Sequence, residues 1–294
     1  MNRTDAGRTS AGRDGVVLAT RTPDRARALA EALRKRRLRL ILSPLRAPRA
    51  LTEPELDALD SALGGGPWEA ATFTSVNGLR GLRAGLARLH AAGRSVHAEP
   101  AALLAGTQVH CVGRATAEEA RAQGLTPAAE TAAGEEEQSA RGLLTRLGRA
   151  GAPGSVLCVH GRPHRPELAD GLRELGAEVT EAVAYAMADW PAPEPLGGQA
   201  PGAAGEERPA ESAAPALDRQ ATAEVLHERA ADVVLVTSPR QLEALHFLGP
   251  LPEPVVCLGS TTVARARELG LAAVTAVSPA PEDLAEAALR ARSG

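Results

Sequence analysis

The chain has 294 residues, a formal net charge of −3, and 44% hydrophobic but only 2% aromatic residues. This length suits two ordinary domains, and the near-zero charge gives no global positive field that would favour a nucleic-acid partner. Lys35 is the only lysine, which excludes a phosphate-binding loop of the G-K-[ST] type and argues against a Schiff-base mechanism. No apolar run approaches the length that a membrane span requires.

The three cysteines and the amino-terminal residues indicate the cellular compartment of the protein. Cys111, Cys158 and Cys257 each lie in a short apolar run, where a strand core is the expected place for them. An odd number without paired spacing favours a reducing cytoplasm over a disulfide framework. Residues 1–14 are polar and lack the apolar region of a signal peptide, so we expect a disordered tail and a cytoplasmic protein.

Short apolar runs alternate with helical patterns along the chain. The predicted elements are, in order, a strand at 15–20, a helix opened by Pro23, strands at 38–45 and 69–75, a helix at 77–93, a strand at 107–113, helices at 115–122 and 140–151, a strand at 154–161, a helix at 165–175, an extended run at 177–187, a strand at 231–238, a helix at 239–247, a strand at 254–260, and helices at 261–270 and 282–292. The strands are rich in Val and Leu without alternation, which is typical of a parallel sheet covered by helices on both faces. Residues 191–218 are rich in Pro, Gly, Ala and Glu and predict a flexible insert.

A short segment occurs twice. When Gly113 is aligned with Gly259, "HCVGRATAEEARAQGL" and "VCLGSTTVARARELGL" are identical at seven of sixteen positions. The runs "TFTSVNGL" and "LVTSPRQL" precede these segments and are also alike. Two similar α/β domains are the simplest explanation of this repeat.

Both copies place serine or threonine where a strand gives way to a helix. Ligands of open α/β sheets bind beyond the carboxyl ends of the strands, and helix N-termini accept anions. A single hydroxyl there can simply cap its own helix, but matching turns in two domains suggest walls that hold one ligand with many acceptor groups. The strand ends in question carry Thr74–Ser75, Gly113–Thr116, His160–Arg162, Thr237–Ser238 and Gly259–Thr262.

Two further features leave alternatives open. Tyr185 is the only tyrosine and could either pack on the sheet or act as a proton-donating phenol between the two halves of the chain. His160 and His164 share the run "HGRPH", but Gly161 and Pro163 break any helix that would align them, so we expect no metal site. The chain contains no G-x-S-x-G, C-x-x-C or dinucleotide fingerprint.

The order of these runs resembles uroporphyrinogen-III synthase, from "TFTSVNGL" through "VLCVHGRPHRPELADGLRELGAEVTEAVAY" to "VVCLGSTTVARARELGL" and "SPAPEDLAEAAL". The resemblance covers residues 15–190 and 222–292. It implies an α/β fold of two similar domains with parallel sheets, joined by a two-stranded connector. Domain 1 would comprise residues 15–49 and 187–294, domain 2 would comprise residues 50–186, and the active cleft would lie between them.

The resemblance also implies a reaction without a cofactor. Hydroxymethylbilane, a linear tetrapyrrole with eight carboxylates, would lose its terminal hydroxyl and close through a spiro intermediate, with its last ring inverted, to uroporphyrinogen III. Because this substrate closes unaided to the uninverted isomer, catalysis must consist mostly of positioning. Tyr185 matches the family tyrosine proposed to donate a proton to the leaving hydroxyl, and a phenol keeps its proton at neutral pH.

The remaining site residues carry over position by position. The predicted substrate-binding residues are Arg21, Thr74, Ser75, Arg114, Thr116, Gly161, Arg162, Arg165, Thr237, Ser238, Thr261 and Thr262. For Arg114 a capping or solvated role is equally plausible. The chain departs from the family in Val76, where proline is usual after Thr-Ser, in the lack of a glycine in "RKRRLRL", and in the long insert.

Competing functions are a non-catalytic two-domain sensor of tetrapyrroles or other anions, and an unrelated transferase of the nucleotide-sugar type. The first would bind uroporphyrinogen without controlling the isomer, and the second would need a nucleotide site that the sequence does not show. For the synthase we expect a monomer that makes a transient contact with hydroxymethylbilane synthase and has no nucleic-acid or membrane partner.

Overall fold

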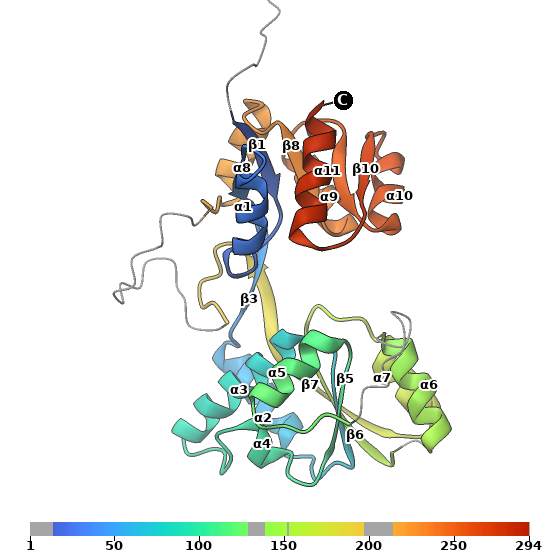
Figure 1. The fold of residues 1–294 in the computed structure, drawn as a ribbon. Coiled ribbons are helices and arrows are strands. Elements are labelled where there is room, and N and C mark those ends of the chain that lie inside the picture. Colours follow the sequence, from blue (N-terminus) through green and yellow to red (C-terminus); the bar gives the residue numbers. More distant parts are fainter. Residues whose placement is uncertain (1–13, 129–138, 152, 197–213, 294) are drawn as a thin grey trace, which may run out of the picture. The chain divides into compact units, whose positions relative to one another are not determined.

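The computed structural model describes residues 14–128, 139–151, 153–196 and 214–293. The predicted tail, except Asp14, and the middle of the predicted insert lie outside these residues. The chain divides into two compact units, one formed by Met1–Leu45 with Ala204–Gly294 and the other by Arg46–Ala203. Each unit contains one five-stranded sheet with helices packed against it (Figure 1).

Unit 1 is built from both ends of the chain. Its sheet has the order β10-β9-β8-β1-β2, and every pair of neighbours is parallel. The strands are β1 (Gly15–Ala19), β2 (Leu38–Leu42), β8 (Val233–Val236), β9 (Val255–Leu258) and β10 (Ala273–Ala276). The helices are η1 (Pro23–Arg25), α1 (Arg27–Arg34), α8 (Arg219–His227), α9 (Pro239–Leu248), α10 (Ser260–Glu268) and α11 (Pro281–Ser293). Because β1 pairs with β8, more than 200 residues later in the chain, the amino-terminal strand is an inner strand of this sheet.

Both faces of this sheet are covered. On one face α1 and α11 pack against Val17 and Ala19 of β1, and on the other α8, α9 and α10 pack against Val16 and Leu18. All five residues of β1 are buried, which explains why the strand reads as a continuous apolar run.

Unit 2 has the sheet order β3-β7-β6-β4-β5. Its strands are β3 (Arg46–Arg49), β4 (Ala70–Phe73), β5 (Gln108–Cys111), β6 (Ser155–Arg162) and β7 (Glu178–Asp189). Its helices are α2 (Glu53–Leu63), α3 (Val76–Ala91), α4 (Pro100–Leu103), α5 (Arg114–Ala122), α6 (Ala140–Ala150) and α7 (Glu167–Glu174). Three strand pairs are parallel, but β3 runs antiparallel to the end of β7, and this pair is the two-stranded connector that the resemblance implies.

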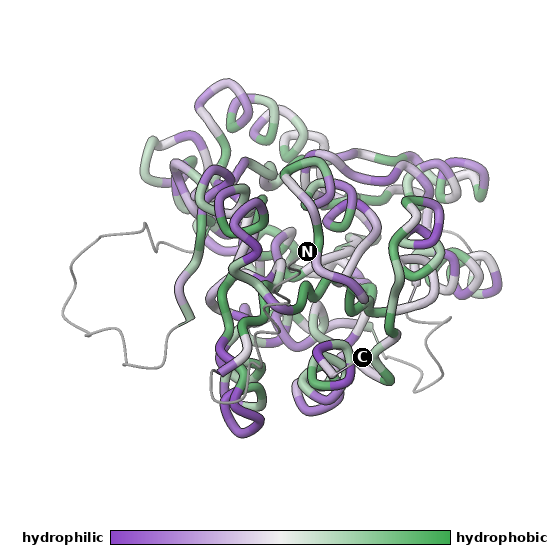
Figure 2. Tube along the Cα trace, turned by 90° about the horizontal axis from the view of Figure 1, so that it is seen from above, coloured by the Kyte–Doolittle hydropathy of each residue, from purple (hydrophilic) through white to green (hydrophobic). Residues whose placement is uncertain are grey.

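The helices of unit 2 divide between the two faces of its sheet. Helices α2 to α5 share one core with Phe73 of β4, whereas α6 and α7 share another with Ala70. Figure 2 shows hydrophilic and hydrophobic residues alternating along the helices. The buried residues of the helices are the ones that share a core with the strands, as expected of amphipathic helices.

The sequence repeat reappears as repeated backbone geometry. Gly113 precedes α5 with φ 82° and ψ 149°, and Gly259 precedes α10 with φ 83° and ψ 155°. Only glycine adopts this region of φ and ψ without strain, which accounts for a glycine at both positions. Ser75 and Ser238 are likewise matched N-caps, each accepting a hydrogen bond from the backbone N–H three residues later.

Several elements were not predicted from the sequence, namely β3, β10, α2, α4 and α8. The start of α2 does carry a sequence signal, because Thr52 and Glu55 form a capping box. The predicted insert is ordered at both ends: the N–H of Leu196 donates to Pro48, and the N–H of Leu217 donates to Leu42. These backbone hydrogen bonds tie the described ends of the predicted insert to the two sheets.

Within the described residues no helix combines the length and apolarity that crossing a bilayer would require.

Candidate functional site

A cavity of about 910 Å³ lies in unit 2 at the carboxyl ends of β4 and β6. Helix α6 and the start of α7 form its other walls. This volume falls within the range of small-molecule sites in proteins. Five of the predicted site residues line the cavity, namely Thr74, Ser75, Gly161, Arg165 and Tyr185.

The Tyr185 side chain is half-buried at this cavity and reaches the start of α3. Its hydroxyl lies 3.3 Å from the Ser75 hydroxyl, and either oxygen can be the donor. Ser75 Oγ also accepts a hydrogen bond of 3.1 Å from the backbone N–H of Gly78, because Ser75 is the N-cap of α3. The cap therefore fixes the serine, and the serine in turn orients the phenol.

Gly161 makes room for the tyrosine ring. The pairing of β6 with β7 shifts register between His160 and Gly161, so that Gly161 lies opposite Tyr185. A Cβ atom at Gly161 would lie only 2.2 Å from Cζ of the Tyr185 ring. The position tolerates no side chain while the ring stays in place, so Gly161 acts by allowing the phenol to enter the cavity.

Basic side chains give the cavity a cationic wall. Arg141, Arg146 and Arg149 of α6 line it together with Arg165, which precedes α7. Such a wall favours a ligand with several carboxylates, because guanidinium groups form strong charge-assisted hydrogen bonds with them. The sequence predicts helix α6 but does not single out its three arginines, since nothing in a chain with this many arginines distinguishes them locally.

Three predicted binding residues of unit 2 lie outside the lining of this cavity. Arg114 is exposed, and its Nε donates to Glu118 at 2.8 Å. Thr116 is only 4% exposed, so its hydroxyl faces the interior of the unit. Arg162 is directed to the start of α2, where it donates to Glu55 at 3.4 Å.

That neighbouring cluster is organised around Glu55. Arg49 donates to both of its carboxylate oxygens, at 2.6 and 2.8 Å. These hydrogen bonds from Arg49 lower the pKa of Glu55 to about 2, although burial opposes the shift. Arg162 therefore contributes to an ion-pair cluster in the described structure.

The predicted residues of unit 1 lie at the carboxyl ends of β1, β8 and β9. Thr237 donates to Gln241 at 2.8 Å, and Ser238 caps α9. Burial and the nearby Arg25 lower the pKa of Arg21, which is half-buried. Thr261 is exposed, whereas Thr262 is only 1% exposed and its hydroxyl has no hydrogen-bond partner within the described residues.

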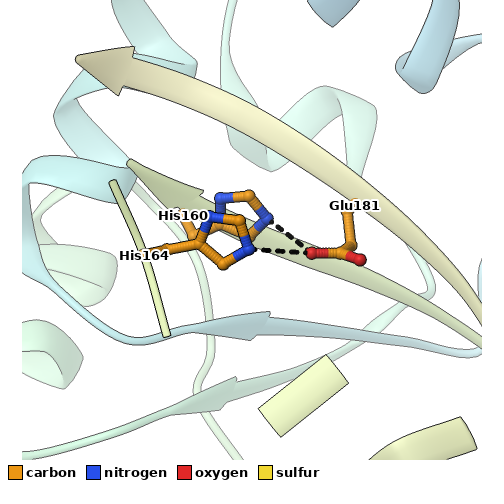
Figure 3. Close-up of side chains that lie close together, drawn as sticks. All are labelled: His160, His164 and Glu181. Atoms are coloured by element: carbon orange, nitrogen blue, oxygen red, sulfur yellow. Dashed lines mark hydrogen bonds and ion pairs between the residues drawn. The ribbon is translucent and has the colours of Figure 1, made fainter. Parts of the chain in front are cut away.

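The structure also brings together His160 and His164, for which the sequence predicts no shared helix. The rings of His160 and His164 stack with centroids 3.6 Å apart, and the Nε2 atom of each lies 3.1 Å from the same oxygen of Glu181 (Figure 3). As predicted, no helix aligns the two histidines, but a turn through Gly161 and Pro163 stacks their rings, which the sequence did not indicate. Glu181 lies on β7, far from "HGRPH" in the chain, and no local pattern could have found it.

Burial and the neighbouring His164 lower the pKa of His160. Burial alone would raise the pKa of Glu181, but hydrogen bonds from Arg173 and His160 hold it below its ordinary value. At neutral pH, Glu181 is therefore a carboxylate beside an imidazole that resists protonation.

Known proteins share this architecture. The HEM4 family model, described as uroporphyrinogen-III synthase HemD, matches residues 27–286. A mutant uroporphyrinogen III synthase from the extremely thermophilic bacterium Thermus thermophilus is 19% identical, with a TM-score of 0.57 over 94% of this chain and 99% of that chain. A uroporphyrinogen-III synthetase from Helicobacter pylori is 16% identical, with a TM-score of 0.53 over the same shares. No curated protein matches the chain.

The two solved structures confirm the predicted fold class of two α/β domains. The family match spans both units and includes the cavity and the repeated turns. The chain therefore belongs to the uroporphyrinogen-III synthase family.

Proposed function

We propose that the chain converts hydroxymethylbilane into uroporphyrinogen III, and that the cavity of unit 2 holds the reacting end of this substrate with Tyr185 as proton donor. The observation that carries the proposal is the Tyr185 hydroxyl, positioned by Ser75 at the edge of a cavity with four arginines. Membership of the family supports this reaction, and the cavity is the site that we propose for it.

The substrate is a polycarboxylate, which suits the cationic wall. Arg141, Arg146, Arg149 and Arg165 would bind side-chain carboxylates, and the exposed Thr74 would donate a further hydrogen bond. Several charge-assisted contacts of about 1.5–3 kcal/mol each would fold the flexible substrate into one conformation. Positioning of this kind decides which carbon of the last ring reacts.

In the chemical step the C–O bond of the terminal hydroxymethyl group breaks. The departing oxygen takes the phenol proton of Tyr185 and leaves as water, and the remaining carbon forms a new C–C bond to the last ring. The spiro intermediate then breaks one C–C bond and forms another, which inverts that ring. A ring carbon finally loses one proton and the phenolate regains one, so the net change is the loss of one water.

Unit 1 offers a second set of donors. We propose that Arg21, Ser238 and Thr261 bind further carboxylates, because each lies at the carboxyl end of a parallel strand. Thr237 would join them by turning its hydroxyl away from Gln241. Thr116 and Thr262 are buried and are not part of this proposal. Arg114 and Arg162 are each paired with a glutamate. We therefore propose that they attract the substrate toward the site and do not bind it there.

The wider biological setting stays a prediction. We expect a cyclising hydro-lyase that acts as a monomer in the cytoplasm. A transient contact with hydroxymethylbilane synthase would shorten the time in which the free substrate can close to the wrong isomer.

The test is the isomer that the protein makes. Purified protein is added to freshly generated hydroxymethylbilane, and the products are oxidised and separated by chromatography. We expect mainly the type III isomer, and Tyr185→Phe should slow its formation while the circular dichroism spectrum stays unchanged. Type I product alone would contradict the proposed function, and full activity of the Tyr185→Phe variant would remove Tyr185 from the mechanism.

A further inference from the structure

We propose that His160, His164 and Glu181 form a binding site for a divalent transition-metal ion of the Zn²⁺ class. Their potential ligand atoms all lie within 4.8 Å of one another, the one such group among the described residues. The proposal is independent of the synthase reaction, since it concerns the binding of the metal ion alone.

Two of the three separations between the ligand atoms are close to those that a metal ion requires. Each histidine Nε2 lies 3.1 Å from the same carboxylate oxygen, Oε2 of Glu181 (Figure 3). Zinc binds histidine nitrogen and carboxylate oxygen at about 2.0–2.2 Å, so tetrahedral ligands lie roughly 3.3 Å from one another. The two rings are nearly parallel, at 16° to one another, so their Nε2 lone pairs do not yet converge, and the partly exposed His164 ring would turn to direct its lone pair at the ion.

The hydrogen bonds around His160 favour a cation at this point. Its Nδ1 lies 3.3 Å from the carbonyl oxygen of Gly161, which can only accept a hydrogen bond. Without a metal ion, Nε2 donates to the Glu181 carboxylate; when a metal ion takes the place of that proton, Nδ1 carries the hydrogen and donates it to the Gly161 carbonyl. An Nδ1–H donated to a backbone carbonyl is the usual support of a metal-binding histidine.

The carboxylate has an outer support as well. Arg173 donates to the other oxygen of Glu181 at 2.7 Å, which leaves Oε2 directed at the two histidines. Hydrogen-bonded carboxylates of this kind are typical of the outer shell of metal sites. The His160 side chain is only 8% exposed, so the ring is held by packing before any ion arrives.

The ligand set indicates the class of metal. Two imidazoles and one carboxylate suit Zn²⁺, and zinc sites with three protein ligands keep a fourth position for water or substrate. His160 and His164 both line the cavity of unit 2, so the fourth ligand would come from within the cavity. A carboxylate of any anionic ligand in the cavity could take that position.

The test uses the full chain, stripped of metal with a chelator. Zn²⁺ is titrated in competition with a chromophoric chelator, and Co²⁺ is added separately to record its visible absorption. We expect one Zn²⁺ per chain. Loss of an outer contact of a metal site weakens metal affinity about 10- to 100-fold. We expect His164→Ala and Glu181→Gln, which each remove a ligand, to weaken Zn²⁺ affinity by more than this.

His246→Ala is the matched control, because His246 is exposed on α9 and belongs to no metal-ligand group among the described residues. It should bind Zn²⁺ like the wild type. Zn²⁺ should also raise the melting temperature of the wild type and the control but not that of the two site variants, which checks that all of them fold.

Three results would overturn the proposal: no binding of Zn²⁺ at one equivalent, binding that His164→Ala and Glu181→Gln leave unchanged, or a Co²⁺ spectrum with thiolate charge-transfer bands. The first would mean that the cluster is a hydrogen-bonded pair of histidines sharing one carboxylate. The others would place the ion elsewhere in the chain.

Discussion

The Gly161→Ala substitution tests the link between the strand register and the reaction. A methyl group at this position would lie 2.2 Å from Cζ and 2.5 Å from Cε1 of the Tyr185 ring, whereas ordinary contacts begin at 3.4 Å. The ring must therefore move by about 1.2 Å, the difference between those distances, or swing out of the cavity. Either movement breaks the 3.3 Å contact between the Tyr185 and Ser75 hydroxyls.

The expected loss of activity follows from this displacement. A misplacement of about 1 Å can lower a rate roughly 10²-fold, and complete loss of a general acid costs about 10²- to 10⁴-fold. We expect Gly161→Ala to lower kcat for uroporphyrinogen III about 10²-fold, which corresponds to about 2.7 kcal/mol of activation free energy. The fraction of type I product should rise, because unaided closure of the substrate then competes better with the slowed enzymatic reaction.

The assay compares the wild type and its variants by stopped-time chromatography of the two isomers. Gly161→Ala and Tyr185→Phe should show similar losses, and the double variant should be no slower than Tyr185→Phe alone, because both changes remove the same group. Gly65→Ala is the control, since a Cβ atom there meets only ordinary contacts of 3.4 and 3.6 Å. It should keep wild-type kcat.

Two results would refute this reasoning. Wild-type kcat in folded Gly161→Ala protein would show that the tyrosine ring need not occupy its position above the glycine. Losses that multiply in the double variant would show that the glycine acts independently of the phenol.

Three further predictions concern stability and reactivity. Because the folded pKa of Glu55 is lowered to about 2, its ion pair stabilises the protein above the unfolded pKa and is lost as the pH falls through 2. Glu55→Gln should therefore reduce the free energy of unfolding by about 2 kcal/mol at pH 7, with the gap closing between about pH 4.5 and 2 in urea titrations; a gap that does not change with pH would contradict this. Gly113→Ala and Gly259→Ala should each cost about 1–3 kcal/mol in thermal melts, because φ near +82° is strained for alanine, and unchanged melting would show that the turns relax. Burial raises the pKa of Cys158 and of Cys257 to about 11, so iodoacetamide at pH 8 should label them far more slowly in the native than in the unfolded protein, as mass spectrometry would show.

Local sequence patterns predict the inner strands, most of the helices and the repeated turns. Apolar runs indicated the inner strands of both sheets, since a strand buried on both faces must be apolar throughout. Gly113 and Gly259 revealed matching turns because their backbone conformation excludes other residues, and Ser75 and Ser238 revealed the starts of their helices. Strand burial, a positive φ angle and an N-cap each constrain a few neighbouring residues, so the local sequence indicates them.

Edge elements were harder to find. Strand β3 is only four residues long and contains Pro48, and β10 is half-exposed, so neither has the apolar run of an inner strand. Their place in a sheet depends on the strand beside them and not on their own composition.

Which side chains meet depends on the tertiary structure. The Thr116 and Thr262 hydroxyls face inward although their sequence context matches a ligand turn, and the α6 arginines line the cavity. Gly161 lies against the Tyr185 ring, and Glu181 lies beside the two histidines. These contacts depend on strand order and on a register shift between β6 and β7, and a one-residue change of register moves every side chain of a strand to the other face. Such alignment is a property of the assembled sheet, so the residues of one strand do not specify it.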